Sequence, residues 1–242
     1  MASAIPLALA DDPCIVPVMP TSPVATWKMY ELLAYVGQLS EPSKMPGFSY
    51  SLPAAECKTG GKLQAIAGST CSGCYAMKGA YVWPVVEAAM YRRLARLEAP
   101  LWAAAMSEIL NRRAVRHPHF RWHDSGDVQS EDHLRRIVAV AEATPTVRHW
   151  LPTREYSIIR DYVAAGGTFP PNLNVRMSAH MVGGVVPTFP RLAGIVTIST
   201  VSRDPGTYPA AHRCPAPSQG NACGSCRACW SRAIATVDYT QH

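Results

Sequence analysis

Short apolar segments alternate with amphipathic ones through the second half of the chain, and this alternation constrains the fold more than any other feature of the sequence. The expected elements are a strand and loop in 119–127, a helix at 130–143, a strand at 147–153, a helix at 156–165, and strands at 173–178 and 194–201. A strand–helix–strand alternation places the strands parallel to one another, with the helices against the sheet. The sequence therefore predicts a parallel sheet, either open or barrel-like.

The first half of the chain predicts further helices and one more strand. Helices are expected at 26–36, 84–98 and 100–115, the last two opened by proline, and a short strand is expected in 44–53. The 21 prolines cluster in the first 53 residues and again in 145–217, so both ends should be rich in loops. We therefore predict an α/β fold in which a partial or irregular β/α barrel-like parallel sheet carries loop-rich, cysteine-containing termini.

The chain is long enough for one substantial core, since it has 242 residues of which 48% are hydrophobic. We divide it into an irregular N-terminal leader (1–43), a β/α barrel-like domain (44–205) and a cysteine-rich C-terminal annex (206–242). The annex is expected to pack on the same domain.

Polar side chains follow each expected strand of the array at the point where the strand ends. They include Ser125 and Asp127 after the first strand, Arg154 after the second, and Arg176 in the third. In parallel sheets the working residues gather at the carboxyl ends of the strands, so these side chains should converge. The two arginines are suited to hold a carboxylate or a phosphate. Any one of the four could instead satisfy nearby backbone groups.

Seven of the eight cysteines form two tight groups, and Cys14 is the one left over. The first group is Cys57, Cys71 and Cys74; the second is Cys214, Cys223, Cys226 and Cys229. Thiolates two residues apart can reach the same soft metal or the same cluster. A C-x2-C-x2-C run, as in the second group, favours a [4Fe–4S] cluster over zinc. We expect one or two such clusters, with zinc as the alternative metal, and we expect the first group to lie in a loop.

Disulfides are the alternative reading of eight cysteines. Disulfide frameworks are typical of short secreted chains, whereas this chain is long and its apolar start at residues 2–10 is too short for a convincing signal peptide. No apolar run approaches the roughly 18 residues that span a membrane. We therefore expect reduced cysteines, a cytoplasmic location and no membrane partner.

The charge balance is mildly basic. The formal net charge is +6, and arginines occur in pairs at 92–93, 112–113 and 135–136 on expected helices. Such pairs are most simply a solvated helix face, and charge alone neither indicates nor excludes a nucleic-acid partner.

The first cysteine group followed by a helix and a β/α array resembles the radical S-adenosylmethionine enzymes, with a long insert after the first cysteine. The resemblance implies that Cys57, Cys71 and Cys74 hold a [4Fe–4S] cluster with one open iron. It also implies that Ser125 and Asp127 bind S-adenosylmethionine and that Arg154 and Arg176 hold an acidic part of the substrate. In these enzymes a 5′-deoxyadenosyl radical abstracts a substrate hydrogen, and the second cysteine group would hold an auxiliary cluster.

Four short segments resemble the phage family called gene product 88. They are Lys44-Met-Pro-Gly, Cys71-Ser-Gly-Cys-Tyr-Ala76, His123-Asp-Ser-Gly-Asp127 and Leu151-Pro-Thr-Arg154. This resemblance covers about residues 40–230. It implies a phage origin, the cytoplasm of a bacterial host, and a host-directed role or a role on a small-molecule or nucleotide-like substrate.

Three functions remain open from the sequence. The chain is an iron–sulfur enzyme of the radical S-adenosylmethionine type with an unknown substrate, a non-enzymatic [4Fe–4S] protein with a structural or electron-transfer role, or a zinc-knuckle nucleic-acid-binding protein. A metal site with three cysteine ligands favours a catalytic role, and a site with four cysteine ligands favours a structural role. Tyr75, Tyr81, Trp83 and Trp230 flank the cysteines and could stack on bases, although packing around the metal loops is the simpler expectation.

Overall fold

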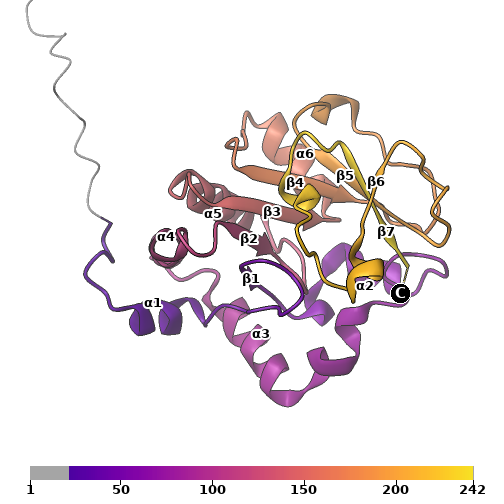
Figure 1. The fold of residues 1–242 in the computed structure, drawn as a ribbon. Helices are drawn as coiled ribbons and strands as arrows, with labels where there is room; N and C mark the ends of the chain where they lie inside the picture. The colour runs from indigo at the N-terminus through magenta and orange to yellow at the C-terminus, as the bar shows by residue number, and fades with distance from the viewer. Residues whose placement is uncertain (1–21, 242) are drawn as a thin grey trace, which may run out of the picture.

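The computed structural model describes residues 22–241, and within them the chain forms one seven-stranded sheet (Figure 1). The strands are β1 (Phe48–Tyr50), β2 (His119–Trp122), β3 (Arg148–Thr153), β4 (Leu173–Ser178), β5 (Thr197–Ser202), β6 (His212–Arg213) and β7 (Thr236–Thr240). Every neighbouring pair is parallel, and the order is β1-β2-β3-β4-β5-β7-β6. Because β1 and β6 are the two edges, the sheet is open, as in a partial barrel. The predicted α/β class and parallel sheet are confirmed.

Within residues 22–241, six α-helices accompany the sheet. They are α1 (Met29–Val36), α2 (Lys58–Gln64), α3 (Pro84–Arg96), α4 (Trp102–Arg113), α5 (Glu131–Glu142) and α6 (Tyr156–Ala164). Five of them lie within the ranges expected from the sequence. The Ser130 side chain accepts a hydrogen bond of 3.1 Å from the His133 N–H, so it caps α5 at its N-terminus.

The expectation of a loop throughout the first cysteine group was wrong, because α2 forms between Cys57 and Cys71. Its sequence, Lys-Thr-Gly-Gly-Lys-Leu-Gln, contains two glycines, which lower helix propensity by up to about 1 kcal/mol each. Tertiary contacts of its first turn, described below, offset that cost. The strands β6 and β7 were also not expected from the sequence.

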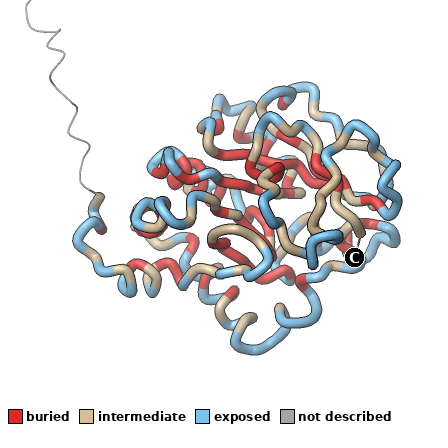
Figure 2. Tube along the Cα trace, in the orientation of Figure 1, coloured by how far each residue is buried: buried red, intermediate tan, exposed pale blue. Residues whose placement is uncertain are grey.

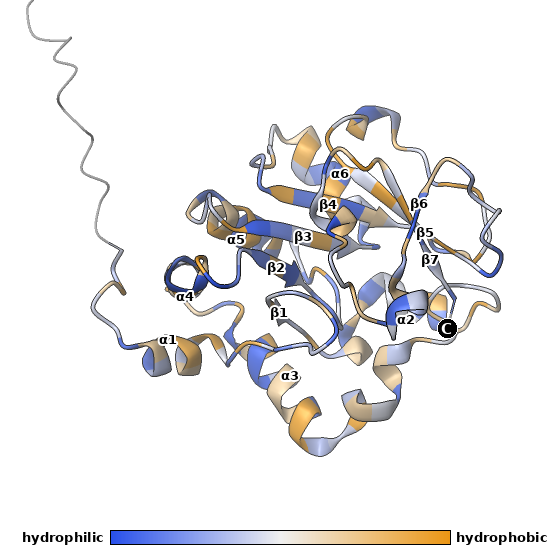
Figure 3. Cartoon of the chain, viewed as in Figure 1, coloured by the Kyte–Doolittle hydropathy of each residue, from blue (hydrophilic) through white to orange (hydrophobic). Residues whose placement is uncertain are grey.

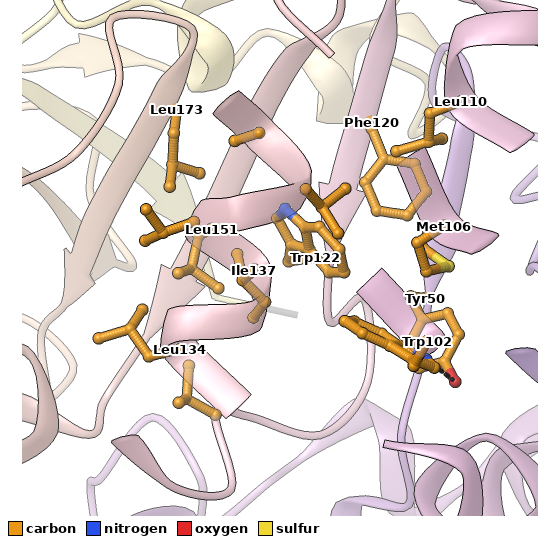
Figure 4. Close-up of a cluster of buried hydrophobic side chains, with 14 of the residues drawn as sticks. Tyr50, Trp102, Met106, Leu110, Phe120, Trp122, Leu134, Ile137, Leu151 and Leu173 are labelled. Atoms are coloured by element: carbon orange, nitrogen blue, oxygen red, sulfur yellow. Dashed lines mark hydrogen bonds between the residues drawn. The ribbon is translucent and has the colours of Figure 1, made fainter. Parts of the chain in front are cut away.

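The apolar core lies between one face of the sheet and helices α4 and α5 (Figure 4). Phe120 and Trp122 of β2 and Leu151 of β3 point into it, where they meet Trp102 of α4 and Ile137 of α5. All five side chains are essentially inaccessible to solvent, and the buried segments follow the strands in Figure 2. Burying an aromatic or aliphatic side chain contributes about 1.5–3 kcal/mol, so this layer is the main source of stability.

The part of the C-terminal annex between β6 and β7 covers the opposite face of the sheet, where it lies in front of the strands in Figure 1, whereas β6 and β7 themselves extend the sheet. Trp230 packs against Trp150 of β3, with ring centroids 5.2 Å apart, and its indole N–H donates to the Phe120 carbonyl at 2.9 Å. The amide of Asn174 donates to the Cys229 carbonyl at 2.8 Å. The annex is thus attached to the sheet by both apolar and polar contacts.

The N-terminal region is described from Ser22 onward, so most of the predicted leader, with Cys14, lies outside the described residues. Within that part, α1 packs on the core through Leu32 and Val36, which are fully buried. Figure 3 shows apolar residues at the start of α3, where Val82 and Val85 are exposed. No helix within residues 22–241 is both long enough and apolar enough to cross a membrane.

Candidate metal centre

The first cysteine group lies across the carboxyl ends of the strands. The Thr70 N–H donates to the carbonyl of His180, two residues beyond β4, at 2.8 Å. The Arg154 side chain, directly after β3, donates to the Thr70 hydroxyl at 3.0 Å. Near β1, the Leu52 N–H donates to the Ser125 carbonyl at 2.8 Å. The segment carrying these cysteines is therefore held against the edge at which functional residues of parallel sheets gather.

Helix α2 anchors Cys57 to the same edge. Glu155, beside Arg154, accepts hydrogen bonds of 2.8 Å from both the N–H and the hydroxyl of Thr59. The ammonium of Lys58 donates to the Gln129 carbonyl at 2.5 Å. A carboxylate at the start of a helix receives the unpaired N–H groups of the first turn, which explains why this glycine-containing segment is helical.

The thiols of this group share one electrostatic environment. Burial raises the pKa of Cys57, and the neighbouring Asp127, Cys74 and Cys71 raise it further. Burial also raises the pKa of Cys71, while the Arg154 guanidinium opposes the shift at both thiols. All three are free cysteines. The metal-free thiols of Cys57 and Cys71 therefore remain protonated at neutral pH, and a bound metal would have to displace those protons.

Gly60 leaves a space between two of these sulfurs. A Cβ atom at this position would lie 3.6 Å from Sγ of Cys57, 3.6 Å from Sγ of Cys71 and only 3.0 Å from Cβ of Cys57. At the neighbouring Gly61 a Cβ atom would meet nothing within 4 Å. The missing side chain at Gly60 thus keeps two soft donors facing the same gap, which fits a thiolate-bound metal centre. Among residues 22–241, however, no three His, Cys, Asp or Glu side chains are arranged closely enough to hold a metal ion as they stand.

Two of the predicted polar residues, Asp127 and Arg154, are brought together beside this group. The Asp127 carboxylate accepts hydrogen bonds from the N–H groups of Val128 at 2.7 Å and Arg154 at 2.8 Å. Burial raises the pKa of Asp127 to about 6, even though hydrogen bonds from Thr153, Arg154 and Val128 act in the opposite direction. Ser125 is 3% exposed, and its hydroxyl has no hydrogen-bond partner among the described residues. A buried hydroxyl without a protein partner can form a hydrogen bond with a water molecule or with a polar ligand.

Arg176 has a different environment. It is fully buried within β4, and its terminal nitrogens donate to the carbonyls of Ile198 (2.6 Å), Ala228 (3.2 Å), Ser231 (3.4 Å) and Ile234 (3.1 Å). Three of these carbonyls belong to the annex. These contacts favour a structural role for Arg176, as the residue that fastens the annex to the sheet, over the predicted contact with a substrate.

The second cysteine group lies on the annex against the sheet. The Cys214 N–H donates to the Asp238 carbonyl of β7 at 2.8 Å, and the Cys223 N–H donates to the Lys44 carbonyl at 2.8 Å. Burial raises the pKa of Cys214 and Cys223, Cys226 raises both values further, and Cys214 adds to the rise at Cys223. Cys226 Sγ lies 3.4 Å from Nε2 of His212. These three thiols, with Cys229, are free as well.

Cys229 is the most deeply placed thiol of the second group. It is 8% exposed, and its Sγ lies 3.0 Å from the Tyr239 hydroxyl of β7. Burial raises the pKa of Cys229 to about 11, and Tyr239, Arg176 and Arg121 oppose the shift. The four cysteines are thus gathered at one end of the annex by contacts to β7 and to the segment before β1.

A family model described as gene product 88 matches residues 28–232, which is most of the chain. The chain belongs to the gene product 88 family. The match runs from the start of α1 to just beyond the second cysteine group. No curated protein and no solved structure matches, so the resemblance to radical S-adenosylmethionine enzymes has no support from these comparisons.

The four segments that resemble gene product 88 are connected to one another or to the cysteine groups in space. The Tyr75 hydroxyl donates to the Asp124 carbonyl, and Asp127 accepts from Arg154. Lys44 contacts the second cysteine group through the Cys223 N–H. The family pattern therefore follows the candidate site and its supports.

Sequence reasoning missed Arg121, which lies between the two cysteine groups of this gene product 88 chain. Its guanidinium lies 4.4 Å from the ring centroid of Trp150, and one terminal nitrogen is 3.4 Å from the hydroxyl of Tyr75, the residue after Cys74. Burial raises the pKa of Cys223 and of Cys229, and the charge of Arg121 opposes that rise. The signal was present in the sequence, because a charged residue between Phe120 and Trp122 in a short strand must face away from the apolar core.

The flanking aromatic residues divide into two kinds. Trp230 is buried against the sheet, as expected for packing around a metal loop. Tyr75 is 47% exposed and Trp83 is 61% exposed, contrary to that expectation, because both lie in the short turns between the first cysteine group and α3. Tyr81 donates a hydrogen bond of 3.1 Å to the Asp124 carboxylate.

Proposed function

We propose that this protein is an iron–sulfur protein whose N-terminal centre, held by Cys57, Cys71 and Cys74, is the reactive one. The observation that carries the proposal is the position of this group: three free thiols, two of them facing the gap at Gly60, at the carboxyl edge of a parallel sheet. We further propose that Cys214, Cys223, Cys226 and Cys229 hold a second, structural cluster. Binding a cluster would require the thiol side chains of each group to rotate toward one another.

The donor sets support this assignment of roles. Three thiolates leave one iron of a [4Fe–4S] cluster without a protein ligand, whereas four thiolates satisfy every iron. The three-thiol group lies beside polar residues at the strand ends. The four-thiol group is enclosed by the annex, where metal binding would contribute directly to folding.

A cluster with an open iron supplies a reducing electron and a position at which a ligand can bind. The chain's own residues would orient that ligand. The free hydroxyl of Ser125 can donate to or accept from a polar group, and the Asp127 carboxylate retains lone pairs that can accept from an amine. Arg154, fixed through Thr70, places a positive charge near the thiolates. This set is suited to an amino-acid-like ligand such as S-adenosylmethionine, which we propose as the cofactor.

The test is electron paramagnetic resonance of the reduced protein after iron and sulfide loading, with and without S-adenosylmethionine. We expect a cluster signal that changes when S-adenosylmethionine is added. Cys74→Ala should remove the responsive signal and Cys226→Ala should not. A cluster signal that does not change when S-adenosylmethionine is added would contradict this cofactor and would favour a structural or electron-transfer role.

The zinc-knuckle alternative is favoured by one observation, the exposed rings of Tyr75 and Trp83 near Cys74. Exposed aromatic rings beside a metal loop can stack on unpaired bases. This function would require zinc in the purified protein, together with oligonucleotide binding that weakens steeply with salt.

A further inference from the structure

The arginine pairs of the helices are almost all engaged with other groups. Five of the six paired arginines donate hydrogen bonds to protein oxygens: Arg92 to Gly37, Arg93 to Ser51, Arg112 to Glu108, Arg135 to Glu131 and Arg136 to Asp132. Among the described residues, Arg113 has neither a hydrogen bond nor an ion pair from its side chain. This exception is the starting point for a second site.

Arg113 lines a cavity of about 670 Å³ at the end of the sheet opposite the first cysteine group. It is the last residue of α4, and its guanidinium lies 4.2 Å from the ring centroid of Phe48, the first residue of β1. His117 packs edge-on against the same ring at 4.7 Å. The floor of the cavity is therefore an aromatic ring with two basic side chains set against it.

The charge on the cavity wall is unbalanced. Arg112, Arg113 and Arg116 line it, and the one carboxylate among the lining residues is Glu41. Arg112 already pairs with Glu108, but Arg116 has no hydrogen-bond partner for its side chain among residues 22–241. Burial lowers the pKa of Arg113, and Glu41 opposes the shift. The partly buried Arg113 guanidinium has no ion-pair partner among the described residues, so an anion bound in the cavity would supply one.

The helix dipole does not account for the whole cluster. The C-terminal end of α4 favours cations in its last turn, which includes Arg112 and Arg113. Arg116 and His117 lie beyond the last helical residue, yet they line the same cavity. Their convergence with Arg113 requires another explanation.

We propose that this cavity binds a phosphate group through Arg113 and Arg116, with His117 as a further donor or acceptor. Guanidinium groups bind phosphate oxygens with two parallel hydrogen bonds, and two of them match the charge of a phosphate. The volume lies in the range of sites for nucleotide-sized ligands. The phosphate belongs either to a free nucleotide or polyphosphate, or to a nucleic-acid strand, and the two sources are distinguished below.

The test is calorimetric titration of the full chain with pyrophosphate and, separately, with a short oligothymidylate. Arg116→Ala removes an exposed side chain, so the variant should fold, and we expect it to weaken binding by at least about tenfold. Arg160→Ala is the matched control, because Arg160 is an exposed arginine on α6 that does not line the cavity. It should bind like the wild type.

The results of these titrations distinguish the two sources of phosphate from one another and from a failure of the proposal. Tight pyrophosphate binding lost in Arg116→Ala indicates a free phosphate ligand. Stronger binding of the oligonucleotide, also lost in Arg116→Ala and steeply dependent on salt, indicates a strand. The proposal is overturned if neither probe binds at millimolar concentration, or if Arg116→Ala and Arg160→Ala weaken binding equally.

Discussion

Glu155 accepts two hydrogen bonds from Thr59, one from the backbone N–H and one from the hydroxyl, each 2.8 Å long. Glu155 follows β3 and is 4% exposed, while Thr59 lies two residues after Cys57 in the first turn of α2. This pair couples the first cysteine of the candidate centre to the edge of the sheet. The position of Cys57 is thus set by a contact between residues 96 positions apart in the sequence.

Thr59→Val should lower the free energy of unfolding by about 1–2 kcal/mol, because it removes the hydroxyl that donates to a buried carboxylate. Thr59→Ser keeps the hydroxyl and serves as the control. Urea denaturation of the metal-free protein measures both values. Equal stability of the two variants would show that the hydroxyl does not anchor α2.

Gly60→Ala should lower the metal content of the N-terminal centre, because its Cβ would occupy the gap between the sulfurs of Cys57 and Cys71. Gly61→Ala adds the same methyl group to the same helix with nothing within 4 Å. Since alanine is the better helix former, Gly61→Ala should retain the metal and gain up to about 1 kcal/mol in stability. Metal analysis of both variants is the measurement, and equal metal loss would contradict the role of Gly60.

Arg176→Met should destabilise the protein by at least about 2–3 kcal/mol, because it leaves four backbone carbonyls without their charged donor. Three of these carbonyls are in the annex, so limited proteolysis within 214–234 should accelerate. Exposed Arg160, replaced in the same way, is the control. If proteolysis of the annex is no faster in Arg176→Met than in the wild type, the predicted role of Arg176 in ligand binding would be favoured instead.

Asp127 should make the metal-free protein less stable as the pH rises from about 4 to about 6. Burial raises its pKa from 3.8 to about 6, so the folded state holds the proton more tightly than the unfolded state. The stabilisation is complete below the unfolded value and is lost as the pH passes the folded value, a difference of about 3 kcal/mol. Asp127→Asn should lack this dependence. Carbon NMR titration of the carboxyl group reads the pKa directly, and a midpoint near 4 would contradict the prediction.

The sheet and most helices could be predicted from the sequence because the periodicity of apolar residues indicates which side chains face the core. The strand β7 could not, since its central residue is the buried Asp238, which pairs with Arg213 and accepts hydrogen bonds from Thr200 and Ser202. In the sequence alone, a carboxylate in the middle of a short segment is typical of a loop. The three partners that allow Asp238 to be buried in a strand are distant in sequence, so they could not be identified. The two glycines of α2 likewise argued against a helix. The contact that stabilises this helix comes from Glu155, which is distant in sequence.

The candidate site was predicted in part. Asp127 and Arg154 meet because both follow strands whose carboxyl ends share one edge of the sheet. Arg176 does not join them, because it lies two residues before the end of β4 and is enclosed by the annex. The annex itself has little periodicity, so no pattern in the sequence could show which strand residues it would cover.

The most direct test is the amount of iron, zinc and acid-labile sulfide per chain in protein purified without oxygen. Two [4Fe–4S] clusters, one at each cysteine group, predict about eight irons and a matching amount of sulfide. Zinc without sulfide, or no bound metal at all, would contradict the proposal that this is an iron–sulfur protein.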